Sequence, residues 1–101
     1  MIVLKETLLL IAPPPRPKIP TVISKNGDIK EVNCTVKTHE VVYVSWYSKG
    51  KQVKAPERRS NTLDITKLDG GKYVCKVRRE DGATSQSTMT IIETGDLTID
   101  D

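Results

Sequence analysis

The chain contains no phenylalanine, and one tryptophan and three tyrosines are its only aromatic residues. Its 101 residues leave room for a single domain, and hydrophobic residues make up 37% of them. Burial is therefore modest in a size range where the ratio of surface to volume already limits stability. A covalent cross-link would help such a domain to stay folded.

Cysteine and histidine are also scarce, with two residues and one residue respectively. These supply too few closely spaced ligands for a zinc site. A catalytic triad needs a base that a carboxylate orients beside a nucleophile, and His39 lies in no recognisable motif of that kind. No glycine-rich phosphate loop or glycosidase-like carboxylate motif stands out either. We therefore expect no enzyme, no catalytic residue, no metal and no cofactor.

Long hydrophobic runs are missing as well. Residues 1–11 are largely apolar, but Lys5 and Glu6 interrupt them, and residues 13–15 are prolines where a leader peptide would have a small-residue cleavage site. The run is also far too short to span a bilayer. We expect neither a leader peptide nor a membrane insertion in this segment, which looks like part of a longer protein.

The most informative feature present is the spacing of a few residues. Cys34 and Cys75 lie 41 positions apart, Trp46 follows the first cysteine, and Asp69-Gly70-Gly71-Lys72-Tyr73-Val74 leads into the second. This combination resembles the immunoglobulin superfamily over about two thirds of the chain. The resemblance implies an all-β, immunoglobulin-like sandwich of two antiparallel sheets with Greek-key topology. It also implies a disulfide from Cys34 in strand B to Cys75 in strand F, with Trp46 covering it and Tyr73 closing the turn into strand F.

The same resemblance divides the chain into three parts. Residues 13–93 are predicted to form the immunoglobulin-like domain, and residues 94–101 an acidic trailing linker. Residues 1–12 are a leading segment, either the last strand of a preceding domain with a stiff proline-rich linker or a disordered or edge-pairing tail. Two cysteines beside a glycosylation sequon favour an oxidising compartment. We therefore expect an extracellular protein, either at the cell surface or secreted.

Alternating apolar and polar residues indicate the strands and their faces. Strand A is predicted to be split by Pro20, because proline cannot donate to a sheet ladder. Sheets A-B-E and G-F-C-C′ should enclose a core that includes Trp46, Tyr73, Leu63 and Ile65. Only residues 55–62 remain before strand E, so strand D should be short or absent, as in an intermediate-set or C2-like domain. The expected boundaries are an Asn-Gly turn at 26–27, strand B at 29–37, C at 41–48, a short C′ at 51–54, F at 71–79 and G at 83–92.

The connection between strands E and F departs from the family pattern. Leu68 directly precedes Asp69, whereas related domains commonly place three residues there. The shorter connection puts the turn closed by Tyr73 in question. Asp69 could still pair with Arg58 or Arg59, as an arginine often does in related domains.

The outward side of the G-F-C-C′ sheet collects tyrosines and basic residues. Tyrosine and arginine are enriched at protein interfaces, and many immunoglobulin relatives pair through this sheet. The alternative is that the lysines only solubilise the sheet and that their stems partly cover the tyrosines. The predicted partner-binding residues are Tyr43, Tyr47, Lys51, Lys72, Lys76 and Arg78.

Two further features bear on partners. Asn33-Cys34-Thr35 fits the N-glycosylation sequon and presents Asn33 outward on the A-B-E sheet, so a glycan there would leave the opposite sheet available for contact. The net charge is +3, with basic residues concentrated in residues 49–59 and acidic ones at the end. This distribution favours acidic protein surfaces and sulfated glycans as partners. We do not expect nucleic acid as a partner, because no aromatic-rich RNA-binding signature accompanies the charge.

The leading hypothesis is a non-catalytic recognition module of a multidomain cell-surface receptor or adhesion protein. It would act through homophilic or heterophilic protein contact. Two alternatives stay open, namely a spacer domain of an intracellular titin-like protein and a secreted or viral decoy. The redox state of Cys34 and Cys75 separates the spacer from the other two.

Overall fold

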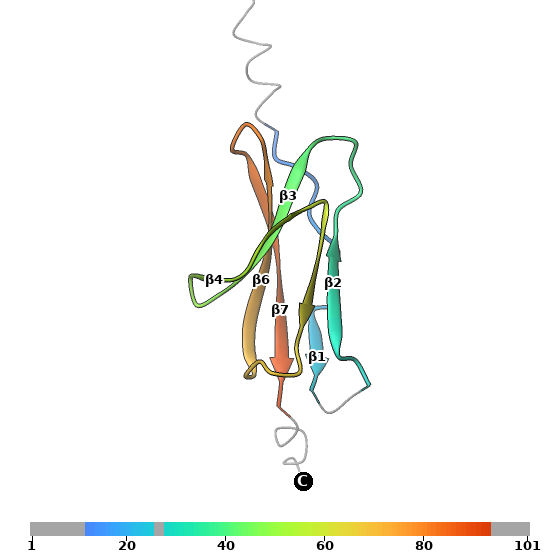
Figure 1. Ribbon diagram of the computed structural model, residues 1–101, viewed down its shortest axis with the longest axis vertical. Helices are drawn as coiled ribbons and strands as arrows, with labels where there is room; N and C mark the ends of the chain where they lie inside the picture. The colour runs from blue at the N-terminus through green and yellow to red at the C-terminus, as the bar shows by residue number, and fades with distance from the viewer. Residues whose placement is uncertain (1–11, 26–27, 94–101) are drawn as a thin grey trace, which may run out of the picture.

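The computed structural model describes residues 12–25 and 28–93 of the chain, and these form two packed β-sheets (Figure 1). The described residues contain strands and no helix. The predicted all-β sandwich is therefore confirmed. The predicted trailing linker, the Asn-Gly turn and residues 1–11 of the leading segment lie outside the described residues.

Seven strands make up the two sheets. The larger sheet has the order β1-β7-β6-β3-β4, and β2 and β5 form the smaller one. Strands β2, β3, β6 and β7 correspond to the predicted strands B, C, F and G. The strands are β1 (Val22–Ser24), β2 (Glu31–Thr35), β3 (Val42–Ser48), β4 (Lys51–Arg58), β5 (Ser60–Asp64), β6 (Gly71–Arg79) and β7 (Thr84–Ile92).

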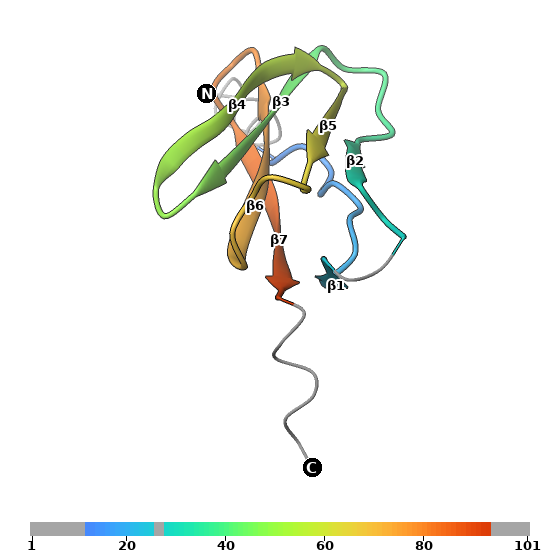
Figure 2. The same cartoon turned by 60° about the horizontal axis from the view of Figure 1, so that its bottom comes forward.

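The segment that was predicted as strand A is divided between the two sheets. Before Pro20, the chain touches the smaller sheet through a single antiparallel bridge between Lys18 and Thr35. After Pro20, β1 pairs in parallel with β7 on the larger sheet, with Ile23 opposite Ile91, and Figure 2 shows the two strands side by side. Pro20 has no N–H to give to a ladder, so the chain can change sheets there. The predicted split is confirmed, but the A-B-E sheet contains strand A only as that one bridge.

The fourth strand runs longer than predicted. A short strand C′ was expected to end at residue 54, but β4 continues to Arg58 and keeps pairing with β3, where Tyr43 lies opposite Arg58. Arg59 then adopts a left-handed conformation with φ of 66°, and β5 begins at the next residue. The described chain therefore has no separate strand D, because the residues available for it extend β4.

The space between the sheets is filled by the inward side chains of the alternating strands. Cys34 of β2 and Cys75 of β6 form a disulfide, which is confirmed, and Trp46 lies opposite Cys75 in the ladder between β3 and β6. The Trp46 side chain is fully buried and its Nε1 donates to the carbonyl of Asn61 at 3.0 Å. The buried hydrophobic residues are Ile23, Val32, Cys34, Val36, Val42, Val44, Trp46, Leu63, Ile65, Tyr73, Cys75, Val77, Met89 and Ile91.

The short connection before β6 still closes a tyrosine corner. The Tyr73 hydroxyl donates to the carbonyl of Asp69 at 2.8 Å. Burial, reinforced by the negative charge of Asp69, raises the pKa of Tyr73 above its usual value. The phenol therefore keeps its proton, and can donate this hydrogen bond, up to a higher pH than an unperturbed tyrosine.

Among the described residues, no ion pair joins Asp69 to Arg58 or Arg59, so that expectation is wrong. The extended β4 explains the difference. Arg58 lies opposite Tyr43, and Tyr43 lies opposite Arg78 near the end of β6, whereas Asp69 precedes the start of β6. The arginines and the aspartate therefore lie at opposite ends of the sandwich.

Candidate functional site

Strand β3 presents two tyrosines on the outward side of the larger sheet, with a small residue between them. Tyr43 and Tyr47 are partly exposed, whereas Ser45 is only 7% exposed. Because a serine side chain is short, it forms the floor of a hollow between the tyrosine rings. This hollow, which we call the tyrosine groove, measures about 200 Å³ and is lined by Tyr43, Ser45, Tyr47, Gln52, Pro56, Lys76 and Arg78.

Two cations from β6 border the tyrosine groove. The ladder between β3 and β6 puts Lys76 opposite Ser45 and Arg78 opposite Tyr43. The Lys76 ammonium lies 5.3 Å from the centre of the Tyr47 ring, a distance that suits a cation–π contact. No carboxylate is among the described residues that line the groove. The groove therefore offers positive charge and phenol and amide hydrogen-bonding groups to an acidic group of a partner.

A second hollow lies directly beside the tyrosine groove. It measures about 270 Å³ and shares Tyr47 and Lys76 with the groove. The stacked Tyr47 and Lys76 side chains therefore form a ridge between two hollows, a central position of the kind that interface hot spots occupy. The Tyr47 hydroxyl also donates to Gln52 Oε1 at 3.3 Å, which holds the ring in place.

The structure gathers four of the six predicted partner-binding residues and leaves two outside. Tyr43, Tyr47, Lys76 and Arg78 line the groove. Lys72 lies farther along the same side of β6, opposite Thr90 of β7, and Lys51 pairs with Ser48 near the turn between β3 and β4. Neither lysine is among the lining residues of either hollow.

Sequence reasoning missed Gln52 and Pro56 as lining residues. Both belong to β4, whose register against β3 is shifted twice around Trp46. Simple alternation cannot follow a strand through such irregularities, because each shift exchanges the two faces. The sequence alone therefore did not show which side chains of β4 face the groove, because the pairing of β4 with β3 decides this.

Arg79 is a second residue that the sequence did not single out. Its guanidinium donates to Asp81 Oδ1 at 3.1 Å, to Glu40 at 3.4 Å and to the carbonyl of Ala12 at 2.7 Å. It thus ties the turn between β6 and β7 to the connection between β2 and β3 and to the chain entering the domain. The sequence did contain one signal for this role. Arg79 follows the same alternation as the inward residues Tyr73 and Cys75, which is unusual for a charged side chain.

We expect acid to weaken the contact between Arg79 and Asp81. The hydrogen bonds from Arg79 and from the Ala83 amide hold the pKa of Asp81 below its usual value. A lowered pKa stabilises the fold above the unfolded-state pKa of about 4, and this contribution is lost as the pH falls through the folded-state value. Asp81→Asn should therefore show a smaller drop in melting temperature than the wild type between about pH 6 and pH 3.

The matched control for this experiment is Asp28→Asn, which changes an exposed carboxylate outside the contact. Its melting temperature should fall with acid as the wild type does. Equal acid sensitivity of Asp81→Asn and the wild type, measured by circular dichroism, would contradict a stabilising role for the contact.

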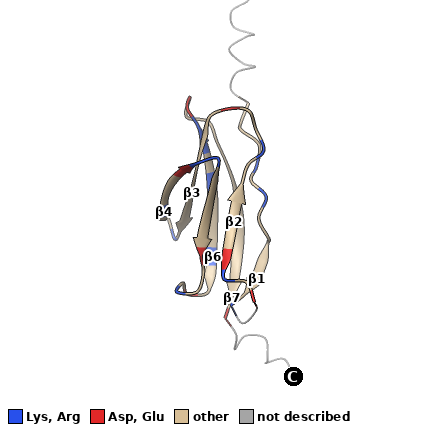
Figure 3. Cartoon of the chain, turned by 45° about the vertical axis from the view of Figure 1, so that its right-hand side comes forward, with Lys and Arg blue, Asp and Glu red and all other residues tan. Residues whose placement is uncertain are grey.

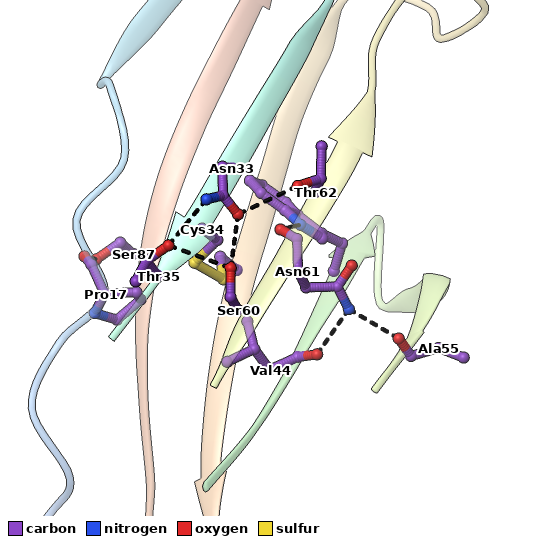
Figure 4. The surroundings of a disulfide bond; sticks show 12 residues. Pro17, Asn33, Cys34, Thr35, Val44, Ala55, Ser60, Asn61, Thr62 and Ser87 are labelled. Atoms are coloured by element: carbon purple, nitrogen blue, oxygen red, sulfur yellow. Dashed lines mark hydrogen bonds between the residues drawn. A yellow bond between two sulfur atoms is a disulfide. The ribbon is translucent and has the colours of Figure 1, made fainter. Parts of the chain in front are cut away.

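Asn33 lies on the outward side of β2, on the sheet opposite the tyrosine groove. Its Nδ2 donates to Thr35 Oγ1 at 3.0 Å, and its Oδ1 accepts from the hydroxyls of Ser60 and Thr62 at 2.8 and 3.2 Å (Figure 4). The residue is exposed. Its glycosylation stays a prediction.

In residues 12–25 and 28–93, no group of three or more histidine, cysteine, aspartate or glutamate side chains could hold a metal ion. Within the same residues, no helix has the length and apolar character that crossing a membrane requires.

Comparison with known proteins agrees with this architecture. A family model described as immunoglobulin domain matches residues 11–92, a range that contains all seven strands and both disulfide cysteines. No solved structure gives a significant match. The family match covers most of the chain, and the chain therefore belongs to the immunoglobulin domain family.

Proposed function

We propose that this domain is a non-catalytic recognition module of a multidomain cell-surface receptor or adhesion protein. Its contact surface is the tyrosine groove, and its ligand is a protein that carries acidic side chains. The observation that carries this proposal is the ridge of Tyr47 and Lys76 between two hollows, with Arg78 at the border and no carboxylate in the lining. Such a face combines an aromatic anchor with steering charges.

The disulfide supports an extracellular place for this module. Disulfides persist in oxidising compartments and are rare in the cytosol, where thiols are kept reduced. The bond between Cys34 and Cys75 is therefore typical of a domain at the cell surface or of a secreted domain. It weighs against the intracellular spacer.

The charge of the groove favours a heterophilic contact. Two copies that met through this face would bring the Lys76 and Arg78 side chains of both copies together in a symmetric interface. Like charges that meet in an interface disfavour association. A different protein with carboxylates at the matching positions fits the groove better.

We expect substitutions in the groove to weaken binding to such a partner strongly. Tyr47→Ala removes the central anchor and should cost about 1–2 kcal/mol or more of binding free energy. Ser45→Gln fills the floor of the groove without changing its charge and should weaken binding by a similar amount. Lys76→Glu with Arg78→Glu should slow association and reduce its salt dependence, because these charges act over the screening length of ~8–10 Å. It should also speed dissociation, because the Lys76 ammonium stacks on the central Tyr47 ring.

The measurement is association and dissociation rates by surface plasmon resonance at two salt concentrations. The partner is first found by screening the domain against an array of extracellular proteins. Ile29→Ala is the matched control, because Ile29 is 48% exposed and lies outside both hollows. If all groove variants keep the wild-type melting temperature and the wild-type rates, this face is only a solvated surface.

A further inference from the structure

A second basic surface lies away from the tyrosine groove. It is a hollow of about 190 Å³, here called the basic groove, between the segment that leads into β1 and the end of β2. Figure 3 shows basic residues along that leading segment. The residues that line the basic groove are Pro15, Arg16, Lys18, Thr35 and Lys37.

The leading segment is held in place, so its cations have defined positions. Pro14 and Pro17 are buried, and their carbonyls accept hydrogen bonds from the hydroxyls of Ser85 and Ser87 on β7. Between and beyond these two anchors the side chains of Arg16 and Lys18 remain exposed. Binding a ligand here would cost little additional ordering of the backbone.

The three cations share one face of the molecule. Lys18 lies opposite Thr35 in the bridge between the leading segment and β2, and directly opposed residues in antiparallel chains point to the same side. Lys37 follows Thr35 by two residues in the same alternation, and both are exposed. No aspartate or glutamate is among the described residues that line the groove.

A row of polar groups continues from the basic groove across the smaller sheet. Thr35 Oγ1 lies 3.2 Å from Ser60 Oγ, and the Asn33 amide joins both hydroxyls (Figure 4). The backbone of Arg59 lies beside this row, because its carbonyl accepts from the Val36 amide at 3.1 Å. Hydroxyl and amide groups therefore extend the basic groove into a polar band that crosses β2 and β5.

The chemistry of this band identifies its ligand class. All aromatic residues of the chain lie on β3 and β6, in the other sheet. The basic groove therefore lacks the stacking platform that single-stranded nucleic acids use and the aromatic anchor that dominates protein interfaces. A sulfated polysaccharide requires neither, because sulfates bind cations and sugar hydroxyls bind polar side chains.

We propose that the basic groove binds a linear sulfated glycan, with Arg16, Lys18 and Lys37 contacting the sulfate groups and Thr35 a sugar hydroxyl. This site is independent of the tyrosine groove. It lies beside Asn33, because Asn33 and Thr35 are two residues apart on β2 and point to the same exposed side. A glycan attached to Asn33 would lie beside the groove and should weaken binding, so the test uses the unglycosylated domain.

The test uses immobilised heparin and unglycosylated domain. The logarithm of the affinity should fall linearly with the logarithm of the salt concentration, with a slope of about −2 to −3 for three cations. Lys18→Glu with Lys37→Glu should weaken binding at least about tenfold and make the slope shallower by about 2. Lys18→Gln with Lys37→Gln is the milder pair if charge reversal prevents folding.

The matched control is Lys30→Glu with Lys67→Glu. This pair changes the net charge equally and also replaces exposed lysines, but outside the basic groove. It should weaken binding less than about threefold, because long-range attraction alone is screened by salt. Equal weakening by both pairs would overturn the proposal, since binding would then depend only on net charge. Tyr47→Ala should leave heparin binding unchanged, which separates this site from the proposed protein-binding function.

Competition identifies the ligand class. Soluble heparin should displace the domain, whereas desulfated heparin, poly-glutamate and single-stranded DNA should not do so at equal charge concentration. Displacement by DNA or poly-glutamate as effective as by heparin would overturn the assignment to a sulfated glycan. Protein from a eukaryotic secretory host should bind more tightly after glycosidase removes the Asn33 glycan. Equal binding before and after removal of a glycan that mass measurement has located at Asn33 would contradict a binding site beside Asn33.

Discussion

Replacing both Cys34 and Cys75 with alanine should lower the free energy of unfolding by about 4 kcal/mol. The two cysteines close a loop with a sequence separation of 41, and a cross-link over that length restricts the unfolded chain by roughly this amount. Typical domains have only about 5–15 kcal/mol of stability in total. We therefore expect the double variant to be largely unfolded near body temperature in a thermal melt.

Reduction of the wild-type protein is the control for this experiment. It breaks the cross-link but leaves both sulfur atoms in the core, whereas the alanine variant also removes buried volume. If loop closure dominates, both treatments should lower the denaturation midpoint by nearly the same amount. Two freely alkylated cysteines in folded material from a secretory host would refute the bridge and the proposed extracellular place together.

Asn61→Ala should lower the free energy of unfolding by about 2–3 kcal/mol, a large effect for a polar residue. Asn61 is 1% exposed, and its Nδ2 donates to the carbonyls of Val44 and Ala55 at 2.7 and 2.8 Å. These bonds connect β5 to β3 and β4, and so join the two sheets (Figure 4). Alanine would leave both carbonyls without that donor in the sandwich.

Two further variants separate hydrogen bonding from volume. Asn61→Leu keeps a side chain of similar size but has no donor, so it should be destabilised about as much as the alanine variant. Thr62→Ala changes the adjacent, more exposed residue of β5 and should cost less than about 1 kcal/mol. The measurement is chemical denaturation with a common slope. Wild-type stability of Asn61→Leu would show that the donor contributes nothing.

Asn61 also illustrates why a buried polar residue escapes a reading of the sequence. It has the same alternation as Leu63 and Ile65, so its inward direction was readable from the pattern. Its role was not, because the two carbonyls that it binds belong to Val44 and Ala55, which lie 17 and 6 residues away in the sequence and on two other strands. The alternation of a strand predicts a face, whereas a hydrogen-bond partner depends on how the strands meet.

The sequence alone predicted the alternation along the strands and the cross-link between them. Through their resemblance to the immunoglobulin superfamily, the positions of Cys34, Trp46 and Cys75 predicted the sandwich and its disulfide. The period of two along the strands predicted which side chains face the core. The bounds of β6 also match the expected residues 71–79. The period of two depends on neighbouring residues only, because successive side chains of a strand point to opposite faces whatever the rest of the chain does.

The tertiary structure alone decided where the recognition surfaces lie. The length and shifted register of β4 placed Gln52 and Pro56 in the tyrosine groove and kept Lys51 out of it. The change of sheet at Pro20 brought the leading segment beside β2, which created the basic groove around Lys18. Both outcomes result from strand pairing between distant parts of the chain. A shift of one residue in such a pairing exchanges the faces of a strand without changing the sequence pattern, so only the folded arrangement determines which side chains meet.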